Sequence, residues 1–278
     1  MINQIKADFY KFKHSKLFLL TSLSYVAILL LYIVLCINGP SKGIQFMAAG
    51  GEFGEKGKNL GFIVKTFLNP DQPQFWEIAR SSISITVFAW MVVAIFSVLF
   101  FTKEYSAGTV KLSVAYGIDK FNIYLSKFLV AVCYTGVFYY LLMIAAFIFT
   151  LSQYHYVLKR IEFMEFLKLV SLNYLVLISF VLICFFVSLI LKNIAVAATF
   201  LYVFIFAGYF IVDSIWHTYA TWTLTETIFI KINPAYYWLR ICGYSLNGIV
   251  QETLSYFFVG MALLLGSSWL ILRKQEIK

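Results

Sequence analysis

The chain alternates long apolar stretches with short polar segments. Each long stretch runs for about 18 residues or more with almost no charge, which is typical of a helix that crosses a bilayer. At about 1.5 Å per residue, each can cross a hydrocarbon core of about 30 Å. We therefore expect an all-α polytopic membrane protein, with residues 1–278 in a single transmembrane domain. The pattern predicts six spans, at Leu17–Ile37, Ile83–Phe101, Phe128–Leu151, Leu167–Leu191, Ile194–Ile215 and Leu254–Leu272.

The segment before the first span is amphipathic. Its apolar residues recur at helical spacing on one narrow face, which favours a helix in the inner membrane interface (residues 1–16) over a mobile basic tail. These residues are Ile2, Ile5, Phe9 and Phe12. Residues 38–82 are rich in Gly and in mixed charge, so we expect an outer loop. The end of that loop, Pro73–Glu77, predicts a short helix that leads into the second span.

Two further connections carry local signals. Lys192 and Asn193 are the whole link between two spans and predict a tight inner hairpin. Residues 233–248 predict a short outer helix, in which Asn233 is the N-cap and Pro234 the first helical residue.

Composition and charge agree with a membrane protein. Hydrophobic residues make up 62% of the chain and charged residues 13%, whereas a soluble domain has about 25% charged residues. The net charge of +9 comes from lysines and arginines beside the spans, which indicates contact with lipid headgroups and excludes nucleic acid as the expected partner. With both termini inside, 12 of the 22 basic residues fall in the shorter, inner segments. We therefore expect an N-in, C-in topology.

The motifs of enzymes and metal sites are absent. No G-x-x-x-x-G-K-[ST] phosphate loop, H-E-x-x-H or G-x-S-x-G occurs, so we expect no catalytic residue, no metal and no cofactor in this chain. The four cysteines show no C-x-x-C spacing. Cys36 and Cys242 both lie near the outer face, and their pairing is left open.

A few residues are candidates for a substrate path. Aromatic residues make up 19% of the chain, and most of them are expected to pack or to contact lipid. Some, represented by Tyr134, Phe138 and Phe204, are candidates to line a path for an apolar or amphipathic substrate. Asp213 and His217 share a helix face near the outer end of the fifth span. Asp213 is either part of that path or, the interpretation we favour, an acid wetted at headgroup depth.

The polar segment 102–127 is the most distinctive part of the chain. It begins with Glu104, continues with Gly108–Thr109, and breaks at Gly117 among spaced lysines. Such an ordered composition between two spans indicates a surface on which a soluble partner can push. A carboxylate in the first turn of a helix is favoured by the helix dipole, so Glu104 is either a cap or a link to a basic inner residue. The basic candidates are Lys11, Lys13 and Lys192.

This segment resembles the loop after span two in type-2 ATP-binding-cassette (ABC) exporter permeases. In that family an E-x-x-x-G-T stretch is followed by G-x-[ST]-R and a later Lys. Here Glu104 and Gly108–Thr109 match the first part, Gly117–Lys120 stands in place of the second, and Lys127 is the closing basic residue. Asp119 replaces Ser or Thr and can still cap the next helix, while Lys120 keeps the charge of Arg without its fork geometry.

The resemblance implies a permease subunit of an ATP-driven exporter in a bacterial cell membrane. A coupling helix around Glu104–Ala115 would dock on a separate cytoplasmic ABC ATPase, which binds the ATP and Mg. The chain would pair with a second copy or a sister permease, and the substrate would be a peptide, antimicrobial, drug or lipid. The implied coupling residues are Glu104, Gly108, Thr109, Lys111, Asp119, Lys120 and Lys127.

One alternative comes from another functional class. A membrane sensor or immunity module that sequesters a peptide at the outer face, without transport, has the same composition. The two functions differ in whether an ATPase copurifies with the chain.

The predicted topology is tested by cysteine labelling in a chain whose own four cysteines are replaced. A membrane-impermeant maleimide is expected to label Ser41→Cys in intact cells and Ser106→Cys only after permeabilisation. The reverse pattern would contradict an N-in, C-in chain.

Overall fold

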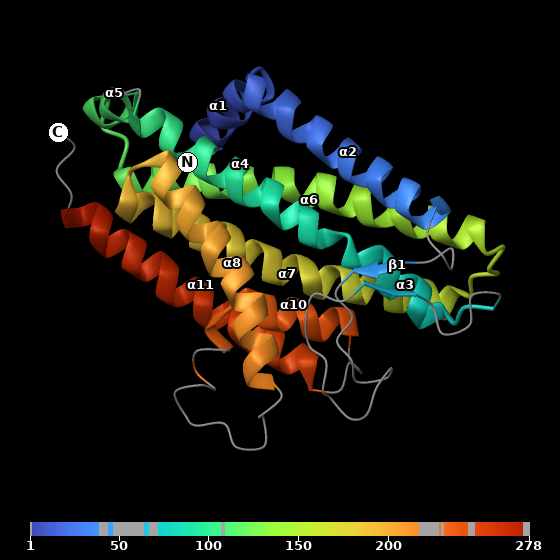
Figure 1. Ribbon diagram of the computed structural model, residues 1–278. Helices are drawn as coiled ribbons and strands as arrows, with labels where there is room; N and C mark the ends of the chain where they lie inside the picture. Colours follow the sequence, from blue (N-terminus) through green and yellow to red (C-terminus); the bar gives the residue numbers. More distant parts are fainter. Residues whose placement is uncertain are drawn as a thin grey trace.

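Apolar helices form an elongated bundle in the computed structural model (Figure 1). The structure describes residues 2–38, 44–46, 64–66, 72–106, 109–216, 228, 231–243 and 248–274. The helices are α1 (Ile2–Lys13), α2 (Lys16–Asn38), α3 (Phe75–Ser84), α4 (Thr86–Ser106), α5 (Thr109–Ala115), α6 (Lys120–Gln153), α7 (Arg160–Leu191), α8 (Ile194–Trp216), α10 (Pro234–Gly243) and α11 (Ile249–Lys274). Two short strands, β1 (Ile44–Phe46) and β2 (Val64–Thr66), pair antiparallel within the expected outer loop.

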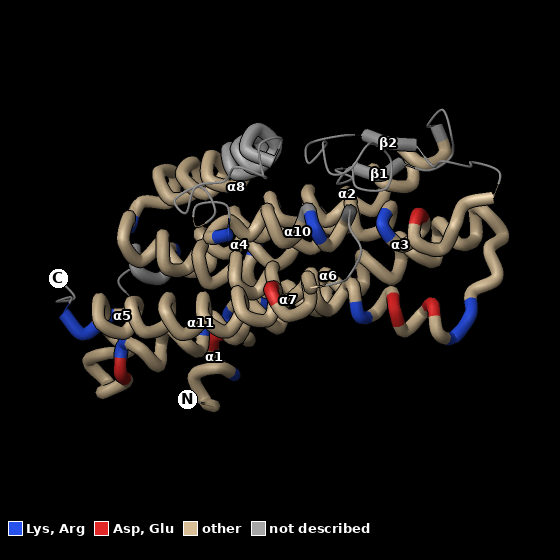
Figure 2. Tube along the Cα trace, turned by 90° about the horizontal axis from the view of Figure 1, so that it is seen from below, with Lys and Arg blue, Asp and Glu red and all other residues tan. Residues whose placement is uncertain are grey.

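Among the described residues, five helices are long and apolar enough to cross a membrane, and each overlaps one of the predicted spans. They are Lys16–Ile37, Phe75–Lys103, Lys120–Gln153, Arg160–Leu191 and Ile249–Lys274. The sixth predicted span coincides with α8, whose described apolar part is Ile194–Ile205, so the count of six stays a prediction. Both termini and α5 lie at the same end of the bundle (Figure 1). Most charged residues lie toward the two ends (Figure 2).

Helix α7 is the centre of the packing. It contacts α4, α6, α8, α10 and α11. Stacked rings fill these contacts: Phe180 lies on Trp90 of α4 with centroids 4.9 Å apart, and Phe166 on Phe147 of α6 at 3.8 Å. By contrast, α2 and α11 lie outside and expose rows of apolar side chains, among them Leu23, Leu30, Phe258, Leu263 and Leu270. Because no water competes in a bilayer, such rows suit contact with lipid.

The start of the second span differs from the prediction. The helix begins at Phe75 instead of Ile83, bends at Ile85 and continues as α4. At the bend, the Thr86 hydroxyl donates to the Ile83 carbonyl at 2.7 Å and accepts from the indole of Trp238 in α10. A hydroxyl that bonds backbone in this way competes with the regular helix ladder and favours a bend.

Helix α3 is buried, although residues 75–82 were expected within the outer loop. Glu77 and Arg80, which we expected in a polar outer loop, are only 4% and 5% exposed. The Glu77 carboxylate accepts from the backbone N–H of Gln74 at 2.9 Å, at the start of the helix. Neighbouring helices α6, α7 and α10 cover the rest of α3. Residues 75–82 therefore belong to the packed protein and not to a loop.

Three further spans also begin before their predicted starts, at Lys120, Arg160 and Ile249, whereas local signals placed one turn and one helix start correctly. The Lys192–Asn193 hairpin is confirmed: Lys192 takes a left-handed φ of 52°, and Asn193 Oδ1 accepts from the N–H of Ala195 at 2.9 Å. The predicted outer helix is α10, and Asn233 Oδ1 caps it by accepting from Ala235 N at 2.9 Å. All four cysteines are free thiols, so Cys36 and Cys242 are not paired.

One close approach between α6 and α7 depends on a glycine. A Cβ at Gly136 would lie against the Tyr174 hydroxyl and 2.9 Å from its Cζ. That hydroxyl donates to the Val132 carbonyl of α6 at 2.7 Å, which holds the ring in place. Gly136 is therefore the site where α7 can approach α6 most closely.

We expect Gly136→Ala to lower the thermal unfolding midpoint in detergent, because overpacking of about 1–3 kcal/mol outweighs a helix-propensity gain of about 1 kcal/mol. Gly260→Ala in α11 is the matched control, since nothing lies within 4 Å of its Cβ position. Adding Tyr174→Phe to Gly136→Ala is expected to recover part of the loss. Equal midpoints for the two single variants would contradict the close approach.

Candidate functional site

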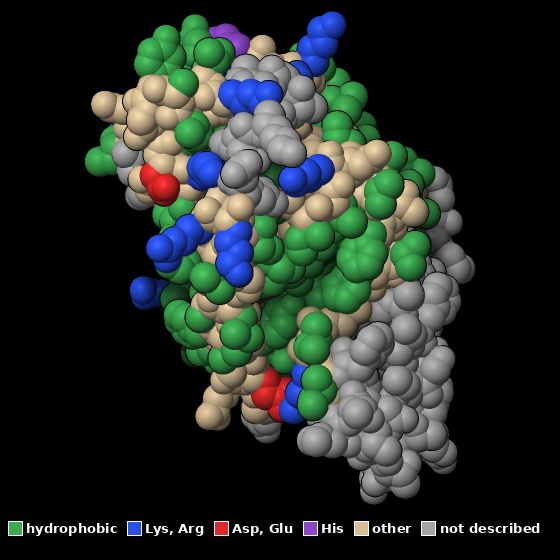
Figure 3. Space-filling view, turned by 90° about the vertical axis from the view of Figure 1, so that its left-hand side faces the viewer, with side chains coloured by type: hydrophobic (Ala, Val, Ile, Leu, Met, Phe, Trp, Pro, Cys, Tyr) green, Lys and Arg blue, Asp and Glu red, His purple; other side chains and the backbone are tan. Residues whose placement is uncertain are grey.

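The residues predicted to meet a soluble partner lie at the end of the bundle that holds both termini. Helix α5 follows α4 there and packs against it through Val110, which is 2% exposed. Its other face is open: Lys111 is exposed, and Leu112 and Tyr116 are 62% and 85% exposed. We call Lys111, Leu112 and Tyr116 the exposed α5 face. Blue side chains, which are Lys and Arg, gather on this end of the molecule, with apolar side chains among them (Figure 3).

A short turn connects α5 to α6. Gly117 has a φ of +83°, which a glycine adopts without strain. The N–H groups of Gly117 and Ile118 donate to the carbonyls of Val114 and Ser113 at 2.9 and 3.1 Å. This pattern is a Schellman motif, which closes the end of α5.

Asp119, two residues after Gly117, caps the start of α6. Asp119 Oδ2 accepts from the backbone N–H groups of Phe121 and Asn122 at 3.1 and 3.3 Å. The predicted cap is thus confirmed. Only residues 116–119 separate α5 from α6, and hydrogen bonds of their backbone and of the Asp119 cap close both helix ends.

Asp8 of α1 and Lys127 of α6 form an ion pair inside the protein. Lys127 Nζ lies 3.7 Å from Asp8 Oδ1, and neither side chain has exposed surface. Ser126 Oγ donates to Asp8 Oδ2 at 2.6 Å, and Gln4 Nε2 donates to Asp8 Oδ1 at 3.3 Å. A carboxylate removed from water is stable only where charged and polar groups replace its hydration. The three partners do so here, and two of them, Ser126 and Lys127, belong to α6 and hold α1 against it.

An aromatic cluster surrounds this pair. Phe12 of α1 is 2% exposed and packs on Phe96, Phe100 and Tyr134, with ring centroids 4.6–5.3 Å apart. Lys127 Nζ lies 5.1 Å from the centroid of the Phe100 ring, a distance at which the ring face attracts a cation. The cluster keeps water from the Asp8–Lys127 pair, and a dry environment strengthens its electrostatic attraction.

The first turns of α6 join several elements. Besides α1, they contact α4 through the Tyr124–Phe101 edge contact, with centroids 5.5 Å apart. They contact α11 through a hydrogen bond from Ser268 Oγ to Tyr124 Oη at 3.1 Å. The start of α6 is therefore in contact with α1, α4 and α11 together.

The predicted coupling residues are distributed differently from the expectation. Lys127 does not lie in the polar segment: α6 begins at Lys120, so Lys127 is two turns inside the helix and buried. Lys111 is exposed on α5, and Asp119 and Lys120 lie at the turn. Gly108 and the side chains of Glu104 and Thr109 lie outside the described residues. The backbone of Glu104 lies in the last turn of α4 and not in the first turn of the next helix, so the interpretation of Glu104 as a cap of that helix is wrong. Its link to a basic inner residue stays a prediction.

The predicted path residues do not form one group. Tyr134 is buried between α2 and α6, where its hydroxyl bonds that of Thr21 at 2.6 Å, and Phe138 contacts it with centroids 4.7 Å apart. Phe204 lies on α8, and its carbonyl accepts from Asn233 of α10 at 3.1 Å. The side chain of Asp213 and the whole of His217 lie outside the described residues.

Sequence reasoning missed Asp8. It grouped Ile2 and Phe9 with Phe12 on an apolar face toward the membrane interface; within the protein the buried residues of α1 are Asp8 and Phe12, while Ile2 and Phe9 are 69% and 49% exposed. The available signal was a lone acid one turn before Phe12 in an otherwise basic helix. No group of three or more His, Cys, Asp or Glu suited to a metal occurs within the described ranges.

Comparison with protein families shows which family the chain belongs to. The model of the family described as ABC-2 family transporter protein matches residues 4–208. The chain belongs to the ABC-2 family of transporter proteins. The matched stretch runs from α1 into α8 and includes α5, the turn and the Asp8–Lys127 pair. No curated protein matches the chain. As an ABC-2 family member, it is a multi-pass membrane protein and a permease subunit, a type that works with an ABC ATPase subunit.

The Asp8–Lys127 pair of this ABC-2 protein is tested by a double-mutant cycle. Lys127→Met leaves a buried carboxylate and Asp8→Asn leaves a buried ammonium, so each is expected to destabilise the chain by about 3–5 kcal/mol. The double variant buries no charge and is expected to recover most of that loss. The measurement is the thermal unfolding midpoint in detergent, with Lys111→Met as the exposed-lysine control. A double variant as unstable as the sum of the singles would contradict a direct pair.

Proposed function

We propose that this chain is the permease subunit of an ATP-driven exporter in a bacterial cell membrane, and that α5 is its coupling helix. The exposed α5 face docks on a cytoplasmic ABC ATPase subunit, which binds and hydrolyses ATP with Mg. The observation that carries this proposal is the continuous connection from that face through the capped turn to α6 and the Asp8–Lys127 pair.

The exposed α5 face has the chemistry of a docking surface. Leu112 and Tyr116 offer apolar area at an end of the bundle where Lys and Arg side chains gather, and Lys111 lies beside them. Apolar and aromatic side chains within a polar rim are the usual anchors of a protein interface. The opposite face of α5 is occupied by its contact with α4.

The proposed mechanism uses two permeases and two ATPases. When the ATPases close on ATP, they push two α5 helices toward each other, and each α5 displaces the start of its α6. Because α6 is joined there to α1, α4 and α11, the displacement tilts these helices together. Lys111 belongs to the docking face, Asp119 and Lys120 to the turn, and Lys127 to the attachment of α1.

The topology proposed for this subunit has six crossings with both termini inside. Support comes from the placement of α5, both termini and the gathered basic side chains at one end (Figures 1 and 3). Basic residues are retained on the cytoplasmic side of bilayers. The helix α8, with 23 residues, supplies the sixth crossing.

The substrate is proposed to be amphipathic or apolar: a peptide or antimicrobial, a drug, or a lipid. Tyr134 and Phe138 lie in the contact between α2 and α6 with Phe18 and Tyr25. A path past them therefore requires α2 to separate from α6. This movement follows when α6 is displaced at its start while the outer end of α2 stays in place.

Docking through the exposed α5 face is tested by Leu112→Asp. A buried, unpaired carboxylate in the interface is expected to abolish copurification of the ATPase and to lower transport by tenfold or more, at about 1.4 kcal/mol per tenfold. Val157→Asp is the matched control, because Val157 is an 85% exposed residue of the turn between α6 and α7 at the opposite end.

Three outcomes separate the alternatives. Loss of the ATPase with Leu112→Asp but not with Val157→Asp supports the coupling role. Retention of the ATPase with both would exclude the exposed α5 face as the contact. Failure of any ATPase to copurify with the unaltered chain would favour a sensor or immunity module that does not transport.

A further inference from the structure

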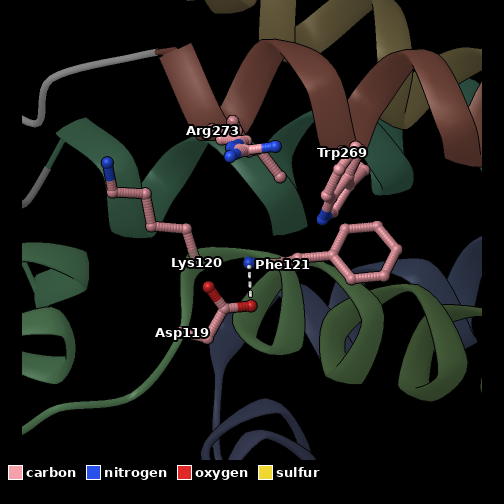
Figure 4. A pocket seen from close by; sticks show the side chains of 6 residues that line it. Asp119, Lys120, Phe121, Trp269 and Arg273 are labelled. Carbon is pink, nitrogen blue, oxygen red and sulfur yellow. Dashed lines mark hydrogen bonds between the residues drawn. The ribbon is translucent and has the colours of Figure 1, made fainter.

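A hollow of about 320 Å³ lies between the start of α6 and the end of α11. Its lining consists of Asp119, Lys120, Phe121, Trp269, Leu272 and Arg273. Figure 4 shows the side chains of Trp269 and Arg273 on α11 facing those of Asp119 and Phe121 on the other element. The hollow lies at the α5 end of the bundle, where α11 ends.

Trp269, one of the two aromatic residues that line the hollow, indicates the depth of the hollow in the membrane. Trp269 is 43% exposed near the last turn of α11, and the Arg273 guanidinium carbon lies 5.5 Å from the centroid of a Trp269 ring. Tryptophan prefers the headgroup region of a bilayer, because it has an apolar body and one N–H donor. Leu272, three residues further toward the end of α11, is 3% exposed and lines the hollow from the protein side.

The charges favour a ligand with one negative charge. Arg273 and Lys120 contribute two positive charges and Asp119 one negative charge, which leaves a net charge of +1. The guanidinium fork of Arg273 matches two phosphate oxygens. One oxygen of Asp119 is engaged by the backbone at the start of α6. The carboxylate repels a dianion, while it accepts a hydrogen bond from a headgroup hydroxyl.

The surface next to the hollow favours a lipid over a soluble anion. Helix α11 is the least buried of the five long apolar helices. It exposes Phe258, Val259, Leu263 and Leu270 along its length. A phosphodiester held beside Trp269 and Arg273 places its acyl chains at the depth of these side chains. Basic pockets between helices on the inner side of a membrane bind lipid headgroups in this way.

The geometry points to a binding site for the headgroup of an anionic glycerophospholipid in this hollow. Arg273 and Lys120 hold the phosphodiester, Trp269 packs against the glycerol region, and Asp119 accepts from a headgroup hydroxyl. Phosphatidylglycerol has the required single charge and hydroxyl donors. The site goes beyond the proposed export function and does not depend on the ATPase.

The test is native mass spectrometry of the full chain in mild detergent with added phosphatidylglycerol or phosphatidylcholine. The unaltered chain is expected to retain one phosphatidylglycerol in preference to phosphatidylcholine. Arg273→Gln is expected to weaken that retention about tenfold or more, because a charge-assisted hydrogen bond to phosphate is lost. Lys274→Gln, the same charge change on the next, equally exposed residue outside the hollow, is expected to keep it.

Three results would overturn the site. Equal retention of phosphatidylcholine would remove the need for an anionic headgroup. Equal weakening by Lys274→Gln would mean a diffuse attraction of lipid to the basic end of α11. Displacement of phosphatidylglycerol by millimolar inorganic phosphate would assign the hollow to a free anion instead of a lipid.

Discussion

A carboxylate and an ammonium group without exposed surface hold the N-terminal helix of this protein against the start of α6. The Asp8–Lys127 pair is expensive to bury, so it is stable only while both groups and their polar neighbours are present. This requirement fixes the position of α1, because Ser126 and Lys127 sit two turns inside α6 and cannot move independently of it. An apolar contact of the same size would tolerate sliding along the helix.

The pair attaches the end of the sequence segment that resembles ABC exporter permeases to α1. In the proposed mechanism the ATPase acts on α5, and the Schellman turn at Gly117 and the Asp119 cap carry that action to α6. The hydrogen bond from Ser268 to Tyr124 and the contact between Phe12 and Phe100 then distribute it to α11 and α4. The N-terminal helix is thereby a moving part of the permease and not a passive anchor in the interface.

The sequence predicted features that depend on neighbouring residues, and it missed features that depend on distant ones. Gly117, Asp119, Asn193 and Asn233 act on backbone within a few positions, so their turns and caps were predicted correctly. The Asp8–Lys127 pair joins residues 119 positions apart, and no local pattern indicates which acid a lysine will meet.

Two errors have the same physical origin. Lys127 was assigned to the polar segment because of its charge, although the Asp119 cap starts α6 well before it. Residues 75–82 were included in the polar outer loop, although the short helix expected from Pro73–Glu77 forms as α3 and is covered by α6, α7 and α10. A charged residue indicates solvent only where no folded partner replaces the water.

The central claim is that α1, α5 and the start of α6 move as one body. Spin labels at Tyr10 of α1 and Ala115 of α5, which are both exposed and lie outside the exposed α5 face, allow their separation to be measured by pulsed electron resonance. The measurement compares the complex with its ATPase in the nucleotide-free state and the ATP-trapped state. The account predicts the same narrow distance distribution in both states. A shift of the mean distance upon ATP trapping would show that α5 moves without α1 and would contradict the account.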